Sequence, residues 1–148
     1  MRSDGAQFDV LIPRHLGERA SGRPGATGAP TIEAPGTQQA LNRSEQVRVR
    51  VGDQEGAITR PNLFGALVGK AATREILVDP GKERHAADFV LLASLLTAAD
   101  LRAETISPRD ASHLGHMIYL VTQTHLPGEI EGGQRGISML RSALRQLN

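Results

Sequence analysis

The chain has 148 residues, of which 39 % are hydrophobic and only 3 % aromatic, so it is long enough for one domain with a modest core. Its 17 basic and 16 acidic residues leave a net charge of +1, which predicts no overall field that would attract nucleic acid or a membrane surface. The absence of cysteine excludes a disulfide scaffold, a thiolate metal site and a cysteine nucleophile. No apolar run approaches the length of a membrane span and no signal-peptide pattern is present, so we expect a cytoplasmic protein without membrane contact.

The first predicted element is a strand over residues 7–12, QFDVLI, which Pro13 closes. Phe8 and Val10 alternate with Asp9, and this period of two places Asp9 on the opposite face of the strand. A carboxylate there is a candidate ligand for Mg²⁺, which prefers oxygen ligands. The alternative is an ordinary surface aspartate on an edge strand.

A loop is predicted over residues 17–36, which hold five Gly and three Pro. Such a composition buries too little apolar surface to offset the entropy lost on ordering, so we expect this loop to be mobile.

A hairpin follows the loop. Valines at positions 47, 49 and 51 alternate with Arg48 and Arg50, which predicts a strand with one apolar and one basic face. Residues 52–56 are predicted to form a five-residue turn before an extended segment at 57–59. The two arginines are a candidate contact for a polyanion, but the low net charge favours a solvated face.

Four helices are predicted after Pro61, because apolar residues recur there with helical period. The first begins at Pro61-Asn62, and the second spans about 82–98. The third begins at Ser107-Pro108, with Ser107 as the N-cap, and a loop over 127–133 precedes the fourth. The predicted core faces are Leu63, Phe64, Leu67, Val68, Ala71 and Ala72; Phe89, Leu92, Ala93 and Leu96; Leu114, Met117, Ile118 and Val121; and Ile137, Leu140, Leu144 and Leu147.

The chain therefore divides into a strand-rich part, residues 1–60, and a helical part, residues 61–148. This order predicts an α+β fold in which a small sheet precedes four helices.

Lys70 and Asp88 are the candidate site residues of the helical part. Lys70 is one of two lysines against 15 arginines and lies in an apolar helix, where a compact ammonium suits a phosphate. The alternative is a lysine whose stem covers the edge of the core while its ammonium stays in water. Asp88 shares a helix face with His85, and the alternative for it is an exposed polar pair near the helix start.

His113 and His116 are three residues apart on the third predicted helix. Two imidazoles at this spacing can share a metal ion, but no third ligand is evident and both lie beside the core face, which disfavours a metal site.

Three segments together resemble the nucleotidyltransferase-like proteins of the type IV abortive-infection toxin (AbiEii) group. They are FDVLIP, EAPGTQQALNR and RPNLFGALVGKAA…KERHAADFVLLASLL, within residues 8 to 117. The most specific piece is the lysine helix followed by a helix that starts with His-x-x-Asp-Phe. The resemblance implies the later part of a polymerase-β-type nucleotidyltransferase core, followed by a helical part.

The resemblance also implies a site. By motif, Asp9 would be a catalytic carboxylate that binds Mg²⁺, Lys70 would meet the nucleotide phosphates, and Asp88 would be a later catalytic acid. The implied reaction transfers a nucleotide from an NTP to tRNA or another acceptor, and the implied protein partner is a cognate antitoxin.

The chain departs from this pattern at its start. The residues before Phe8, MRSDGAQ, contain neither the Gly-Ser turn nor the paired Asp-x-Asp that hold Mg²⁺ and the triphosphate. We therefore expect a truncated or degenerate form that is inactive alone, with Mg²⁺ bound only if the missing motif is supplied. The alternative is a non-catalytic interaction module that binds a nucleotide or an antitoxin. A small RNA-binding domain is disfavoured because the chain has only three Phe and one Tyr.

Overall fold

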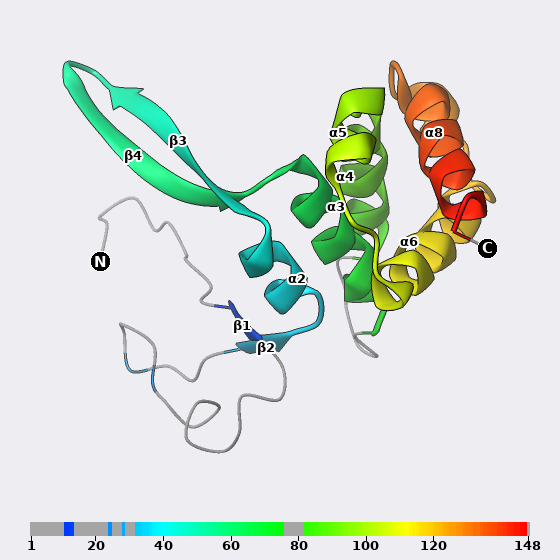
Figure 1. Ribbon diagram of the computed structural model, residues 1–148, viewed down its shortest axis with the longest axis horizontal. Helices are drawn as coiled ribbons and strands as arrows, with labels where there is room; N and C mark the ends of the chain where they lie inside the picture. The colour runs from blue at the N-terminus through cyan, green and yellow to red at the C-terminus, as the bar shows by residue number, and fades with distance from the viewer. Residues whose placement is uncertain (1–10, 14–23, 25–27, 29–31, 76–81, 148) are drawn as a thin grey trace.

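The computed structural model describes residues 11–13, 24, 28, 32–75 and 82–147. Within these residues two small sheets precede a body of helices, so the predicted α+β class is confirmed (Figure 1). No described helix is long and apolar enough to span a membrane.

The first sheet contains two short strands. Strand β1, Leu11–Pro13, pairs in parallel with strand β2, Ile32–Ala34. The start of the strand predicted over residues 7–12 lies outside the described residues, and Pro13 belongs to the strand instead of closing it. The loop predicted over 17–36 is wrong at its end, because β2 lies within it. This segment is extended because it pairs with β1, which is distant in the sequence. The local composition carries no signal of that pairing.

The second sheet is the predicted hairpin. Strand β3, Ser44–Val51, pairs antiparallel with strand β4, Gln54–Pro61, and the hairpin projects away from the helices (Figure 1). The five-residue turn predicted at 52–56 is wrong, because Val51 pairs with Gln54 and leaves a two-residue turn. Gly52 has a φ of 60°, the left-handed conformation that such tight turns need.

Cross-strand ion pairs run along the exposed hairpin. Arg50 lies opposite Glu55 with 3.1 Å between charged groups, and Arg60 lies opposite Glu45 at 2.9 Å. Arg48 is exposed. Since Arg50 has an acidic partner and both pairs are exposed, the hairpin presents mixed charge rather than a basic face.

Helix α2, Thr37–Asn42, lies in a stretch for which the sequence predicted no helix. It follows Gly36, whose φ of 78° a residue with a side chain rarely adopts. A Cβ atom at this position would lie 2.7 Å from Cβ of Ala72, so the start of α2 packs tightly against helix α3. A helix this short depends on such packing, and its local pattern is correspondingly weak.

Helix α3, Leu63–Ala72, begins where the sequence predicted. The side chain of Asn62 accepts a hydrogen bond from the backbone N–H of Gly65 at 2.8 Å, which satisfies one free donor of the first turn. A 3₁₀ turn, η1 (Thr73–Glu75), extends the helix.

The second helix, predicted over about 82–98, ends four residues earlier in the structure, and a short helix that was not predicted follows it. Helix α4 covers Lys82–Ser94 and helix α5 covers Ala98–Ala103. Helix α5 begins at the N-cap Thr97, whose side chain accepts a hydrogen bond from the backbone N–H of Asp100, while Asp100 Oδ2 accepts one from the backbone N–H of Thr97.

Helix α6, Pro108–Val121, begins with the predicted N-cap Ser107, and its Asp110 completes a capping box. One turn of helix, α7 (Leu126–Glu129), lies in the segment predicted as the loop 127–133. The helical part therefore contains the four expected helices and two short ones that join them.

Helix α8, Gly133–Arg145, completes the described helices. Ile137 and Leu140 are buried as predicted, and Leu144 is partly buried. The prediction that Leu147 belongs to the core is wrong, because the helix ends before this residue and its side chain is 50 % exposed.

One core holds helices α3, α4, α6 and α8 together, and the predicted apolar faces supply most of it. Its largest fully buried side chains are Phe64, Phe89, Leu67, Leu96, Leu114, Met117 and Leu140. The sheets contribute little to this core, so the helical body carries most of the hydrophobic stabilisation.

Arg43, at the junction of α2 and β3, connects the first half of the chain to the helical body. Its guanidinium donates to Glu104 Oε2 at 2.8 Å, to Asp110 Oδ2 at 2.8 Å and to the carbonyl oxygen of Thr105 at 3.0 Å. The same group lies 5.1 Å from the centre of the Phe64 ring, within cation–π range.

This network is largely shielded from water. The side chains of Arg43 and Glu104 are 14 % and 13 % exposed, and that of Asp110 is 2 % exposed. Asn62 donates to the second oxygen of Glu104 at 2.6 Å. Asp110 Oδ1 has no hydrogen-bond partner among the described residues, so the charge of Asp110 depends heavily on Arg43.

We predict that Arg43→Met lowers the free energy of unfolding by about 3 kcal/mol, because it leaves two shielded carboxylates without their cation. Urea denaturation followed by circular dichroism measures this loss. The exposed hairpin variant Arg48→Met is the control and changes stability by less than about 0.5 kcal/mol. Equal losses in the two variants would contradict the role of Arg43.

Helices α4 and α8 cross closely at Gly136. A Cβ atom at Gly136 would overlap the carbonyl group of Ala93, which is backbone and cannot rotate away. Arg135, beside this glycine, donates a hydrogen bond to the carbonyl oxygen of Ser94 at 2.7 Å. It thereby satisfies a carbonyl group at the C-terminal end of α4.

We predict that Gly136→Ala destabilises the protein by about 1–3 kcal/mol, because the two helices must separate to admit the methyl group. The control is Gly115→Ala in α6, where a Cβ atom meets nothing within 4 Å. This control raises stability by about 0.5–1 kcal/mol, since alanine favours the helix. Thermal melting compares the two, and the same direction of change in both would contradict the close crossing.

Candidate functional site

The structure brings together Lys70 and Asp88, two of the three residues predicted for the site. Lys70 lies near the end of α3 and Asp88 lies in α4, and the two helices pack against each other. Lys70 Nζ donates to Asp88 Oδ2 at 2.7 Å. The side chains are 30 % and 35 % exposed, so the pair is accessible from solvent.

Further basic groups surround this carboxylate. Arg84 Nε lies 3.9 Å from Asp88 Oδ2, and His85 Nδ1 lies 3.5 Å from Lys70 Nζ. The hydrogen bond from Lys70 lowers the pKa of Asp88, and the charges of Lys70, Arg84 and His85 lower it further. Asp88 is therefore ionised near neutral pH, yet Lys70 and Arg84 outnumber it. This cluster of four side chains, which we call the Lys70 site, keeps a positive charge that suits a phosphate.

Asp9, the third predicted site residue, lies outside the described residues. Among the residues that are described, no group of three His, Asp or Glu side chains is placed to hold a metal ion. Asp88 has Lys70 as its nearest partner, which is an arrangement for a salt bridge rather than for a cation site. The Lys70 site therefore does not supply the donor set that Mg²⁺ requires.

His113 and His116 occupy different environments on α6. His113 is buried, and its Nδ1 lies 3.4 Å from Glu75 Oε1. His113 Nε2 has no hydrogen-bond partner among the described residues. His116 is exposed to solvent. The sequence had placed both rings beside the core face, but only His113 is buried.

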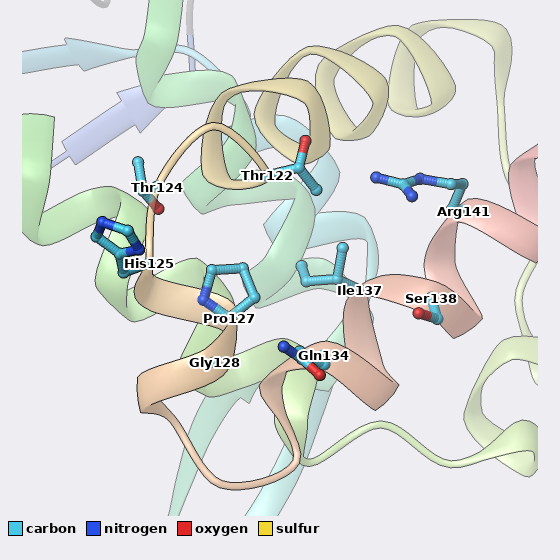
Figure 2. A pocket seen from close by; sticks show the side chains of 9 residues that line it. All are labelled: Thr122, Thr124, His125, Pro127, Gly128, Gln134, Ile137, Ser138 and Arg141. Atoms are coloured by element: carbon cyan, nitrogen blue, oxygen red, sulfur yellow. The ribbon is translucent and has the colours of Figure 1, made fainter.

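A groove between α6 and α8 is a feature that the sequence analysis did not single out. It consists of two adjoining pockets of about 410 Å³ and 290 Å³, which share Thr122 and Arg141. We call them together the α6–α8 groove. Figure 2 shows the first pocket, with the Arg141 side chain extending from α8 toward Thr122 at the end of α6. The only sequence signal was that Arg141 and Arg145 lie outside the apolar face of their helix.

Comparison of the chain with protein-family models, with curated proteins and with solved structures found no match.

Burial of His113 makes the stability of the protein depend on pH. Desolvation lowers the pKa of His113 below its ordinary value of 6.5, and the charges of Arg109 and His116 act in the same direction. Glu75 and Asp110 oppose this shift. Between the lowered pKa and 6.5 the unfolded chain binds more protons, so this contribution to stability is full above pH 6.5 and is lost as the pH falls.

We predict that the slope of unfolding free energy against pH below 6.5 becomes shallower in His113→Gln. Urea denaturation at a series of pH values measures the slope. His125→Gln is the matched control, because His125 is exposed and its replacement leaves this contribution in place. An unchanged slope in His113→Gln would show that His113 does not titrate differently in the two states.

Proposed function

We propose that the Lys70 site binds the phosphates of a nucleoside triphosphate and that the chain is part of a nucleotidyltransferase of the AbiEii type. The observation that supports this proposal is the 2.7 Å contact between Lys70 Nζ and Asp88 Oδ2 on neighbouring helices. The sequence resemblance assigned these residues to one site although 18 positions separate them.

In this proposal Lys70 is the phosphate contact. Its ammonium is a compact charge with three donors, of which Asp88 engages one and His85 lies near another. Because 30 % of the side chain remains exposed, a phosphate oxygen can reach the ammonium without displacement of the core. Arg84, with a side chain that is 81 % exposed, can swing to a second phosphate oxygen.

Asp88 acts as a positioning residue for Lys70. Its ionised carboxylate holds the ammonium at the surface of α4, where it would otherwise sample many rotamers. A partly exposed salt bridge of this kind contributes less than about 1 kcal/mol to stability. Loss of Asp88 is therefore expected to change ligand binding more than folding.

The catalytic part of the proposal depends on residues beyond this site. Nucleotide transfer to tRNA or another acceptor needs the Mg²⁺ that the resemblance assigns to Asp9 and to a paired Asp-x-Asp motif. The described residues do not supply such a metal site, so the proposal for them is limited to binding of the triphosphate.

A second candidate function is a non-catalytic interaction module that binds a cognate antitoxin. Leu91, in the last turn of α4, and Leu95, directly after the helix ends, favour it, because their side chains are 53 % and 60 % exposed. Leu91 lies three residues after Asp88 on the same helix, so a protein bound there would lie beside the Lys70 site.

We predict that Lys70→Ala lowers the affinity for ATP, CTP, GTP or UTP roughly 10- to 100-fold, the range expected for loss of one charged hydrogen bond. Isothermal titration calorimetry on the whole chain measures it. Lys70→Arg keeps the charge and retains part of the affinity. Arg102→Ala, which removes one charge from an exposed position of α5, is the control and leaves affinity unchanged.

Two outcomes would count against the proposal. Wild-type affinity in Lys70→Ala would remove the phosphate role, provided that circular dichroism shows the variant folded. Loss of antitoxin capture in Leu91→Ser with Leu95→Ser, together with unaltered capture in Lys70→Ala, would favour the interaction module instead.

A further inference from the structure

The α6–α8 groove has the chemistry of an anion site that is separate from the Lys70 site. None of the residues that line its two pockets is acidic. Its basic lining residues are His125, Arg141 and Arg145. Lys70, Arg84 and their neighbours do not line either pocket, so the two sites differ in every residue.

Charge is distributed unevenly in this part of the chain. Helix α8 carries Arg135, Arg141 and Arg145 and contains no Asp or Glu, although the whole chain has a net charge of only +1. Arg135 is engaged with the end of α4. Arg141 and Arg145 form no hydrogen bond or ion pair with any described residue, so both guanidiniums are available to a ligand.

Arg141 occupies the centre of the groove, because it lines both pockets. Ser138 lies on the same helix one turn earlier and Gln134 one turn before that, and each adds a polar group to the lining. Figure 2 shows Pro127 and Ile137 between His125 and Arg141, so apolar side chains separate the polar groups of this pocket. A guanidinium fork above an apolar floor favours a bidentate contact with a phosphate.

An aromatic ring lies beside this charge. Tyr119 is 70 % exposed and lines the second pocket together with Arg141 and Arg145. It is the only tyrosine in the chain, which has no tryptophan. An exposed ring next to two arginines offers a face on which one nucleobase can stack while its phosphate meets a guanidinium.

We propose that the α6–α8 groove binds one nucleoside monophosphate unit, with the phosphate on Arg141 and the base against Tyr119. Arg145, one turn beyond Arg141, adds positive charge to the same pocket. The pocket volumes suit a ligand of this size, since small-molecule sites commonly enclose about 300–1,000 Å³. The unit is either a free mononucleotide or one residue of an RNA strand, because both present the same phosphate and base.

The fluorescence of Tyr119 tests this proposal directly. Because the chain contains a single tyrosine and no tryptophan, its emission reports from the α6–α8 groove alone. Titration of the whole chain with AMP is expected to quench this emission to saturation, after correction for absorbance with free N-acetyltyrosinamide. Adenosine, which lacks the phosphate, binds at least about tenfold more weakly.

Variants assign the quenching to the proposed contacts. Arg141→Ala raises the AMP concentration needed for half-quenching by roughly tenfold or more, and Arg141→Lys lies between this variant and the wild type. Arg102→Ala removes the same charge elsewhere and leaves the titration unchanged. Lys70→Ala also leaves it unchanged, which separates this groove from the triphosphate site proposed above.

A third arm identifies the source of the nucleotide. Decaadenylate RNA is titrated in the same way, with its concentration counted per strand. If its half-quenching concentration is lower than that of AMP, the ligand is an RNA strand. If it is equal or higher, the ligand is a free mononucleotide. The proposal is overturned if neither AMP nor the RNA quenches to saturation. It is overturned equally if Arg141→Ala, folded by circular dichroism, titrates as the wild type does, or if adenosine matches AMP.

Discussion

The guanidinium of Arg43 is the interaction on which the assembly of the two halves depends. It lies between α2, which belongs to the strand-rich part, and the turn between α5 and α6, which belongs to the helical body. The hydrophobic core lies almost wholly in the helices, so apolar burial alone does little to attach the sheets. Two shielded carboxylates need this cation, and no other described basic group reaches them. The attachment is therefore specific as well as strong.

Close helix contacts then place the candidate sites. Packing of α3 against α4 brings Lys70 to Asp88, and the crossing at Gly136 sets α8 against α4. Arg141 reaches its groove from this same helix. Both sites lie at the rims of helix pairs, where side chains retain access to water while their helices are fixed by the core. The rigid body thus positions charged groups without burying them.

The low net charge of the chain conceals two local concentrations of positive charge. At the Lys70 site, the basic side chains of Lys70, Arg84 and His85 surround the carboxylate of Asp88. In the α6–α8 groove, two arginines have no acidic partner among the residues that the structure describes. Four acidic residues are engaged elsewhere: Glu45 and Glu55 pair across the hairpin, and Glu104 and Asp110 pair with Arg43. Net charge therefore excludes a global field but not a local phosphate site.

The period of the hydrophobic residues and the capping residues were sufficient to predict those helices and strands that depend on their own residues. The apolar face of α3, the hairpin strands and the start of α6 at Ser107-Pro108 follow from their own residues, because burial of one face and a satisfied first turn are local requirements. Strand β2 and helix α2 were missed, since their stability comes from partners distant in the sequence. The sequence placed Lys70 and Asp88 in one site only through a resemblance. Their contact, the Arg43 network and the α6–α8 groove were decided by tertiary structure, because each joins side chains from different elements whose packing no local pattern encodes.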